Sequence, residues 1–225
     1  MWTKSKSWKS LHNPSVKVYA PSVSVVVPTY NEEDTIVHKL RNLMEQNYSN
    51  TEIIIVDGAS EDKTVELIEK FVKDNGFDLK LIKEEERRGK ASALNDVFKC
   101  CSKEIVVITD ADATWEKDTL KKAVSNFSDP NVGAVTGRQI LLNPNQSLAT
   151  KVEKTYRNIY EVLRVGEQAI DSTPIFHGEI SCFRRSLIEN ISEDSMADDS
   201  ELAVKIRKKG FRRYVSIEGL YCSLL

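Results

Sequence analysis

Apolar runs and amphipathic segments alternate along the first 140 residues of the chain. Short runs rich in β-branched residues, each typical of a buried strand, occur at 23–27, 53–56, 79–82, 105–109 and 132–135. Between them, apolar residues recur at helical spacing near 36–47, 65–72, 90–101 and 117–127. This repeated strand–helix pattern predicts an α/β fold with a mostly parallel central sheet flanked by helices. We expect Asn31 and Ser60 to cap the helices that follow them.

The alternation stops after residue 140. Apolar residues at positions 148, 152, 156, 159 and 163 predict a long amphipathic helix. It is followed by a predicted strand at 180–183, a short helix from 184, a helix that opens at 197–202 and ends at Gly210, and a final strand at 214–217. We therefore expect a single domain over 21–225, with one half at about 21–140 and another at about 141–225.

Composition and charge fit one sizeable domain. The 225 residues are 29% charged and 40% hydrophobic, as in ordinary globular proteins. A net charge of −2 gives no general attraction to nucleic acid, so no nucleic-acid partner is expected. Residues 1–20 form a polar, basic arm with Trp2 and Trp8 among lysines. That pattern suits either a membrane surface or a loosely ordered terminus.

The cysteines favour a reducing compartment. The chain has 4 of them, none in a Cys-x-x-Cys pair, and no Cys/His cluster has zinc spacing. We expect Cys100 and Cys101, at the end of an amphipathic helix, to be buried free thiols. No stretch approaches the ~20 apolar residues of a membrane span, and no apolar run follows the N-terminal lysines, so no secretory signal is present. A cytoplasmic location is expected.

The strand at 105–109 carries the most informative chemistry, because it runs directly into Asp110-Ala111-Asp112. In open α/β sheets, ligands bind at the carboxyl edge of the strands. Two carboxylates at close range suit Mg²⁺ or Mn²⁺, which often bind through one or two carboxylates and substrate phosphates. Right-handed crossovers bring Tyr30, Asp57 and Lys90 to the same edge. The alternative is a strand that ends in a solvated acidic turn.

Common phosphate-binding loops are absent from the sequence. There is no G-x-x-x-x-G-K-[ST] motif and no G-x-G-x-x-G after the first strand. The sequence is therefore neither that of a P-loop NTPase nor that of an obvious dinucleotide-binding protein.

Taken together, the edge motifs resemble the family 2 glycosyltransferases, which have the GT-A fold. The matching segments, in order, are VSVVVPTYNEE (23–33), IIIVDGASEDKT (53–64), GKASALN (89–95), VVITDAD (106–112), VGAVTGRQ (132–139), HGEISCFRRSLI (177–188) and ADDSELAVKIRKKGFR (197–212). Each segment is weak by itself, but their common order and spacing make the resemblance specific. It implies a Rossmann-like nucleotide-sugar half at about 21–140 and an acceptor half at about 141–225.

The resemblance assigns the first two loops to the nucleotide. The family's first loop, which holds the base, corresponds here to Pro28, Thr29, Tyr30 and Glu32. Asp57 corresponds to the acid that bonds the base or ribose. Asp57 can also cap the turn that follows it, and one carboxylate could do both.

The resemblance assigns the phosphate and metal roles to three further residues. Lys90, at a helix start after Gly89, would meet phosphate or the donor nucleotide, although a solvated lysine there is the ordinary alternative. Asp110 and Asp112 correspond to the family's DxD motif, in which the second acid usually ligates Mn²⁺ or Mg²⁺ and the first contacts the ribose or the metal's shell. We expect them on an extended segment, where residues two apart point the same way.

Asp199 corresponds to the family's catalytic base, and Asp198 stands where many relatives have Glu. Asp199 would take the proton from an acceptor hydroxyl in a single displacement that inverts the anomeric carbon. Burial near Asp110 and Asp112 would raise its pKa, whereas the metal would lower it. The alternative is an acidic helix start. On the acceptor side the resemblance also places His177, Gly178, Arg184 and Arg185.

The segment after 132 resembles the processive-like branch that includes cellulose, chitin and hyaluronan synthases. That branch usually continues into a Gln-x-x-Arg-Trp motif and membrane helices, which this sequence does not contain. We expect a catalytic domain cut from a longer protein at the cytoplasmic face of the membrane; a naturally short enzyme is the alternative.

The expected activity is an inverting, metal-dependent transfer of a sugar from a nucleotide diphosphate sugar to a hydroxyl of a glycan or lipid-linked acceptor. By family habit the donor is a UDP-sugar, with a GDP-sugar as the other candidate. A sugar-nucleotide nucleotidyltransferase and a non-catalytic nucleotide-sugar-binding module are the alternatives.

Overall fold

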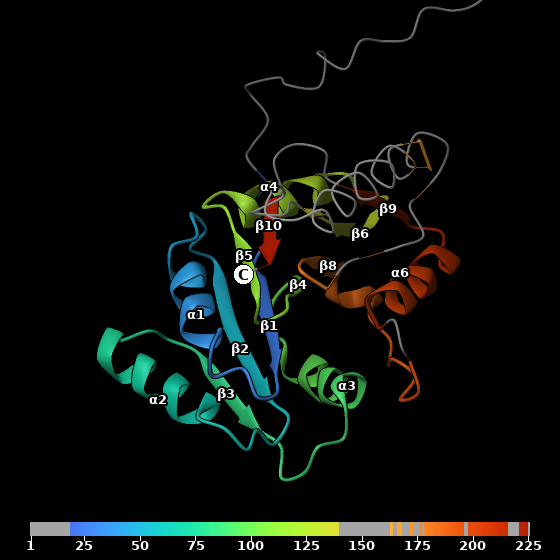
Figure 1. Ribbon diagram of the computed structural model, residues 1–225. Helices are drawn as coiled ribbons and strands as arrows, with labels where there is room; N and C mark the ends of the chain where they lie inside the picture. Colours follow the sequence, from blue (N-terminus) through green and yellow to red (C-terminus); the bar gives the residue numbers. More distant parts are fainter. Residues whose placement is uncertain are drawn as a thin grey trace, which may run out of the picture.

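The computed structural model describes residues 19–139, 178–195, 198–215 and 221–224, together with residues 163, 166, 167, 172 and 176 (Figure 1). Its main sheet has seven strands in the order β3-β2-β1-β4-β8-β6-β9. A second sheet has three strands in the order β5-β10-β7. The N-terminal arm and most of the predicted helix at 148–163 lie outside the described residues.

The first part of the chain forms the predicted parallel layer. Strands β1 (Val23–Thr29), β2 (Thr51–Asp57), β3 (Lys80–Lys83) and β4 (Ile105–Ile108) pair in parallel, and helices α1 (Ile36–Met44), α2 (Thr64–Asn75) and α3 (Lys90–Cys100) connect them. Because side chains alternate along a strand, β1 serves two cores. Val25 packs with α1 and α2 on one face, whereas Val26 packs with α3 on the other. Figure 1 shows these helices on opposite sides of the sheet.

The later strands make the sheet mixed. β8 (Ser181–Arg184) lies antiparallel between β4 and β6 (Val132–Thr136), and β9 (Arg212–Val215) pairs in parallel with β6. The local pattern predicted β6 as a strand, but it carried no information on which strand would be its neighbour. Helix α4 (Thr119–Ser125), with the 3₁₀ turn Asn126–Ser128, precedes β6.

Helix α6 (Asp198–Lys208) packs closely on β6, after the 3₁₀ turn Arg185–Leu187 that follows β8. A Cβ at Gly133 would lie 2.6 Å from Ile206 Cγ2 and 2.7 Å from Phe211 Cβ. Only glycine allows this approach. The packing holds the N-terminus of α6 at the edge where β4 ends.

The three-stranded sheet was not predicted. It consists of β5 (Ala113–Trp115), β7 (Arg138–Gln139) and β10 (Tyr221–Leu224), and β10 is the last described strand, later than the predicted final strand at 214–217. Leu224 pairs with Ala113, directly after the Asp110-Ala111-Asp112 turn. A three-residue strand such as β5 leaves too short a pattern to identify from sequence.

The predicted helix caps at Asn31 and Ser60 are wrong. Helix α1 begins after Thr35, and α2 begins after Lys63. Asn31 has a φ of 55° and accepts a hydrogen bond from the Glu61 amide, while the Ser60 hydroxyl bonds Asp57. Short polar side chains bond any backbone group within reach, so these residues fasten the two loops to each other.

Two smaller expectations also have an outcome here. Cys101 is a buried free thiol as expected, but Cys100 is exposed. None of the helices in the part of the chain that the structure describes is long and apolar enough to cross a membrane.

Candidate active site

A cavity of about 370 Å³ opens at the carboxyl edge of β1, β2, β3 and β4. Its lining includes predicted site residues from three separate segments: Pro28, Thr29, Tyr30, Glu32, Lys90, Asp110 and Asp112. The parallel pairing explains this gathering, because it places the ends of neighbouring strands at one edge. The strand order puts the ends of β2 and β3 on one side of the cavity and the end of β4 on the other.

Asp110 and Asp112 lie on a turn and not on the extended segment that we expected. Strand β4 ends at Ile108, and the Ala113 amide donates to the Asp110 carbonyl at 3.4 Å. Both carboxylates nevertheless belong to residues that line the same cavity. The turn brings them there because its two ends are fixed by β4 and β5.

Lys39 of α1 holds this turn from beneath and was not identified from the sequence. Its Nζ donates to Thr109 Oγ1 at 2.6 Å and to the Ala113 carbonyl at 2.8 Å. Lys39 is 1% exposed, and its ammonium lies 4.6 Å from the centre of the Trp115 ring. The available signal was a lysine on the otherwise apolar face of the predicted helix.

Gly178 touches the same turn from the second half of the chain. Its carbonyl accepts a hydrogen bond from the Asp110 amide at 3.0 Å. A Cβ at position 178 would lie 2.2 Å from Asp110 Oδ2. Residue 178 must therefore be glycine if Asp110 is to keep this position.

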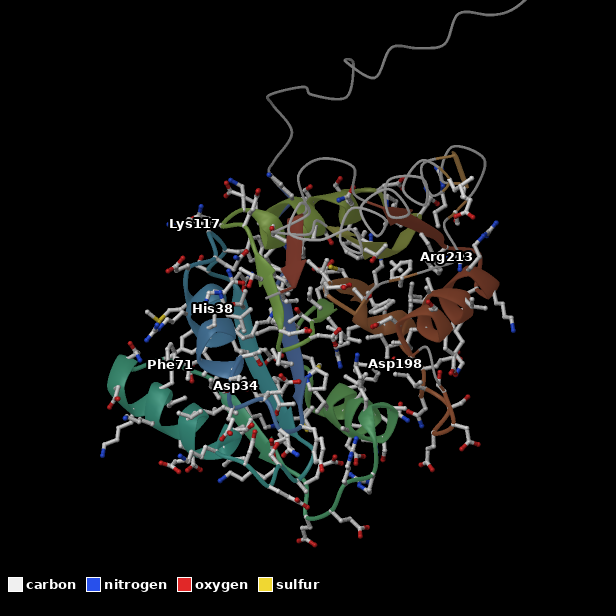
Figure 2. The ribbon with its side chains drawn as sticks, in the orientation of Figure 1. Asp34, His38, Phe71, Lys117, Asp198 and Arg213 are labelled. Carbon is white, nitrogen blue, oxygen red and sulfur yellow. The ribbon has the colours of Figure 1, made fainter. Side chains whose placement is uncertain are left out.

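Lys90 joins the Asp110 turn to helix α6. Its Nζ lies 2.9 Å from Asp110 Oδ1 and 3.5 Å from Asp198 Oδ2. Burial alone would lower the pKa of Lys90, but the carboxylates of Asp110, Asp199 and Asp198 outweigh burial and raise it. The ammonium therefore stays charged beside the cavity, where it can meet a phosphate. Figure 2 shows Asp198 between α6 and α3.

Asp199 follows in the first turn of α6 and is 6% exposed. Its Oδ1 is buried and has no hydrogen-bond partner among the described residues. Burial raises its pKa to about 7, Lys90 opposes the rise, and Asp198, Asp110 and Glu179 add to it. A carboxylate with an open oxygen and a pKa near neutrality is suited to accept a proton.

The carboxylates fit a divalent cation that is shared with a ligand. Asp112 is partly buried and lines the cavity, and no hydrogen bond or ion pair involves its side chain within the described residues. Among these residues, no group of three or more His, Cys, Asp or Glu side chains could hold a metal by itself. Mg²⁺ and Mn²⁺ are commonly bound by one or two carboxylates plus phosphate oxygens, so Asp112 and Asp110 match that donor set.

Asp57 does not present its carboxylate to the cavity. It is 2% exposed, and its oxygens accept hydrogen bonds from the Ser60 amide at 2.9 Å, the Ser60 hydroxyl at 2.6 Å and Thr29 Oγ1 at 3.2 Å. The structure therefore shows the turn-capping alternative that we had left open. Its contact with a nucleotide stays a prediction.

Arg184 and Arg185 do not line this cavity, and their acceptor-side assignment stays a prediction. In the β4–β8 pairing Ser181 lies opposite Ile108, so Arg184 lies opposite Ile105, at the other end of the strand. Arg184 donates to the carbonyls of Val132 and Phe127, both at 2.7 Å. The antiparallel direction of β8, which the motif could not reveal, sends the two arginines away from the cavity. His177 lies outside the described residues.

Arg87 and Glu84 line the cavity but were not selected from the sequence. The Arg87 guanidinium stacks 3.8 Å from the centre of the Tyr30 ring. Both residues belong to the acidic-then-basic run 84–88 just before Gly89-Lys90, which was the available signal. A charge run is usually a solvated surface, so its sequence alone does not identify Glu84 and Arg87 as site residues.

Comparison with known families identifies the chain. A family model described as "Glycosyl transferase family 2" matches residues 24–192. The chain belongs to glycosyl transferase family 2. The predicted family and the GT-A-type fold, a mixed but mostly parallel sheet with flanking helices, are confirmed.

Two of the similar proteins are poly-beta-1,6-N-acetyl-D-glucosamine synthases. The chain is 29% identical over 194 residues to a poly-beta-1,6-N-acetyl-D-glucosamine synthase of Staphylococcus aureus, covering 84% of this chain and 47% of that protein. It is 28% identical over 188 residues to the Staphylococcus epidermidis synthase, covering 82% of this chain and 45% of that protein. The chain thus spans about half the length of these relatives.

Solved structures share the fold. A mannosyltransferase from Pyrobaculum calidifontis, PcManGT, in complex with GDP-Man and Mn²⁺, aligns with a TM-score of 0.82 and 40% identity over 97% of this chain and 60% of its own. S. aureus TarS in complex with UDP-GlcNAc aligns with a TM-score of 0.66 and 21% identity over 91% of this chain and 59% of its own. The TarS likeness concerns the fold alone.

Proposed function

We propose that this domain is an inverting glycosyltransferase that uses a nucleotide diphosphate sugar together with Mn²⁺ or Mg²⁺. The observation that carries the proposal is the contact of Lys90 with both Asp110 and Asp198, together with the buried Oδ1 of Asp199, which has no hydrogen-bond partner among the described residues. Lys90 thereby links a phosphate- and metal-type donor set to a candidate proton acceptor.

The chemistry divides among these side chains. Asp112 and Asp110 would hold the cation, which when bound offsets the charge that develops on the departing diphosphate. Lys90 adds a fixed positive charge beside the same phosphates. Asp199 takes the proton from the acceptor hydroxyl. The oxygen of that hydroxyl attacks the anomeric carbon on the face opposite the diphosphate. One displacement of this kind inverts the configuration.

Relatives inform the choice of donor and acceptor. The 40% identical mannosyltransferase was solved with GDP-Man and Mn²⁺, which supports a GDP-sugar beside the UDP-sugar expected from family habit. The named synthases act in polysaccharide formation, which supports a glycan or lipid-linked acceptor. We propose that transfer takes place at the cytoplasmic face of a membrane.

Calorimetric titration of UDP, GDP and CDP, each with and without Mn²⁺, tests the donor site. We expect one nucleotide to bind tightly only with the metal, and Asp112→Ala to abolish that metal-dependent affinity with the fold intact. Asp74→Ala, which removes an exposed carboxylate on α2, serves as the control and should bind as the parent chain does. Unchanged metal-dependent affinity in Asp112→Ala contradicts the assignment.

Turnover separates the transferase from the alternatives. Release of nucleoside diphosphate from a nucleotide sugar, dependent on an acceptor, is the expected result. A requirement for a nucleoside triphosphate and a sugar phosphate would indicate a nucleotidyltransferase. Nucleotide-sugar binding without turnover in a full-length protein would indicate a binding module.

A further inference from the structure

Glu84 carries a buried carboxylate oxygen that nothing in the described protein satisfies. The residue directly follows β3, and its amide donates to the Asp57 carbonyl at 2.9 Å. Its side chain is 5% exposed, and its Oε1 accepts an ion-paired hydrogen bond from Arg88 Nη2 at 2.5 Å. Its Oε2 is buried without a hydrogen-bond partner in the part of the chain that the structure describes. A buried carboxylate oxygen left in this state is costly, so a ligand that donates to it would be favoured.

This oxygen belongs to the end of the cavity that lies farthest from the DxD turn. Glu84 and Gly58 both line the cavity, and a Cβ at Gly58 would lie 3.6 Å from Glu84 Oε2. The strand order β3-β2-β1-β4 separates the ends of β3 and β4 by three strand spacings, about 14 Å. A nucleoside diphosphate with its diphosphate at Asp110 and Asp112 would extend its base toward this end.

The chemistry of Oε2 distinguishes between bases. An ionised carboxylate only accepts hydrogen bonds. The Watson–Crick edge of guanine offers two adjacent N–H donors, whereas uracil offers one N–H between two carbonyl oxygens that a carboxylate repels. Cytosine offers an amino group beside two acceptors. Of these three edges, only that of guanine presents two adjacent donors to the carboxylate, N1–H and the 2-amino group, with its O6 acceptor to one side of them.

We propose that Glu84 Oε2 accepts hydrogen bonds from the base edge of guanine and thereby makes the donor a GDP-sugar. The assignment rests on the proposed function, since it assumes that the cavity holds a nucleotide diphosphate sugar. The Tyr30–Arg87 stack forms part of the same cavity wall and gives the base a planar surface. Asp57 already accepts three hydrogen bonds, from Ser60 and Thr29, whereas Glu84 Oε2 accepts none from the described residues.

Affinities of GDP, IDP and UDP, measured with Mn²⁺ by titration calorimetry, test the proposal. We expect the parent chain to bind GDP at least about tenfold more tightly than UDP, as one charge-assisted hydrogen bond allows. IDP, which lacks the guanine amino group, should fall between them. Glu84→Gln, which replaces the ionised acceptor by an amide of the same shape, should remove most of the preference while leaving UDP binding nearly unchanged.

Two control variants isolate the oxygen. Glu85→Gln removes an exposed neighbouring charge. Arg88→Gln breaks the ion pair of Glu84 but keeps Oε2. Both should preserve the ratio of GDP to UDP affinity, and melting temperatures of all variants check that the fold is retained.

Four results would contradict the assignment. Tighter binding of UDP by the parent chain, or an unchanged GDP-to-UDP ratio in Glu84→Gln, excludes guanine recognition by this residue. An equal loss of GDP and UDP affinity in Glu84→Gln places the carboxylate on the ribose instead. If the parent chain binds none of the nucleotides with Mn²⁺, the donor site itself is refuted, and that failure is distinct from binding that does not depend on Glu84.

Discussion

Charged residues from the predicted site motifs lie at both ends of strand β4, but their surroundings differ. At the carboxyl edge of β4, the Asp199 Oδ1 is buried and has no hydrogen-bond partner among the described residues. At the opposite edge, Arg184 donates to the carbonyls of Val132, Phe127 and Asp129 and stacks on Phe127 at 5.3 Å. At the first edge a buried carboxylate oxygen remains available to a ligand. At the second edge the charged side chain satisfies backbone carbonyls.

A sequence motif specifies which residue types are present, whereas their hydrogen-bond partners in the folded chain decide whether they bind a ligand or stabilise the fold. A buried polar atom without a partner costs folding free energy, so it persists where another molecule satisfies it or where function requires it. A guanidinium whose donors reach several carbonyls stabilises the chain segments it joins.

Asp199→Asn should reduce turnover about a thousandfold, because an amide cannot take the acceptor proton. Mn²⁺-dependent nucleotide affinity, measured by calorimetry on the same preparation, should stay within about twofold of the parent value. Retained turnover would remove Asp199 from its assigned role, and loss of nucleotide binding would mean that the residue shapes the donor site.

Gly178→Ala should lower turnover up to about a hundredfold, since an atom displaced by about 1 Å near the reacting groups can cost that much. Its Cβ would lie 2.2 Å from Asp110 Oδ2 and force that carboxylate away from Lys90. The double-mutant cycle is the check: in an Asp110→Ala background, which lacks the contacted atoms, Gly178→Ala should add little. Additive losses would show that the glycine acts by another route.

Activity should be about half of its high-pH plateau at pH 7 and about a tenth of it at pH 6, and it should fall further at lower pH. The reason is that Asp199 must be ionised to accept a proton, and its pKa is raised to about 7, so acid protonates it. A profile of kcat/KM against pH measures this directly. A midpoint near 4, the ordinary value for an aspartate, would contradict the raised pKa.

Arg184→Ala should change activity less than about twofold per folded molecule, yet lower the free energy of unfolding by about 2 kcal/mol. The variant leaves the carbonyls of Val132, Phe127 and Asp129 without their donor. Urea denaturation gives the stability. Arg185→Ala is the matched control, because the Arg185 side chain is exposed and makes one hydrogen bond within the described residues, to the Cys101 carbonyl at 3.2 Å. A specific loss of acceptor affinity in Arg184→Ala would return this residue to the acceptor side.

The fold was largely predictable, and the exceptions share a cause. Strands β1, β2, β3 and β4 follow from their own apolar residues, because burial on a sheet leaves a local pattern. The antiparallel insertion of β8 between β4 and β6 left no such pattern, since strand neighbours are chosen by packing between distant segments. The same insertion places Arg184 opposite Ile105, at the end of β4 that lies away from the cavity.

The candidate site divides along the same line. Hydrophobic periodicity and its interruptions are local properties, so they already place four site residues at the ends of helices and strands: Lys90, Asp110, Asp112 and Asp199. The contacts between distant segments came from the fold. There Lys90 bridges Asp110 and Asp198, the Ser60 hydroxyl donates a hydrogen bond to Asp57, and the buried Oε2 of Glu84 has no hydrogen-bond partner among the described residues. Burial, pairing and pKa depend on which distant segments meet, and that information arises when the chain packs.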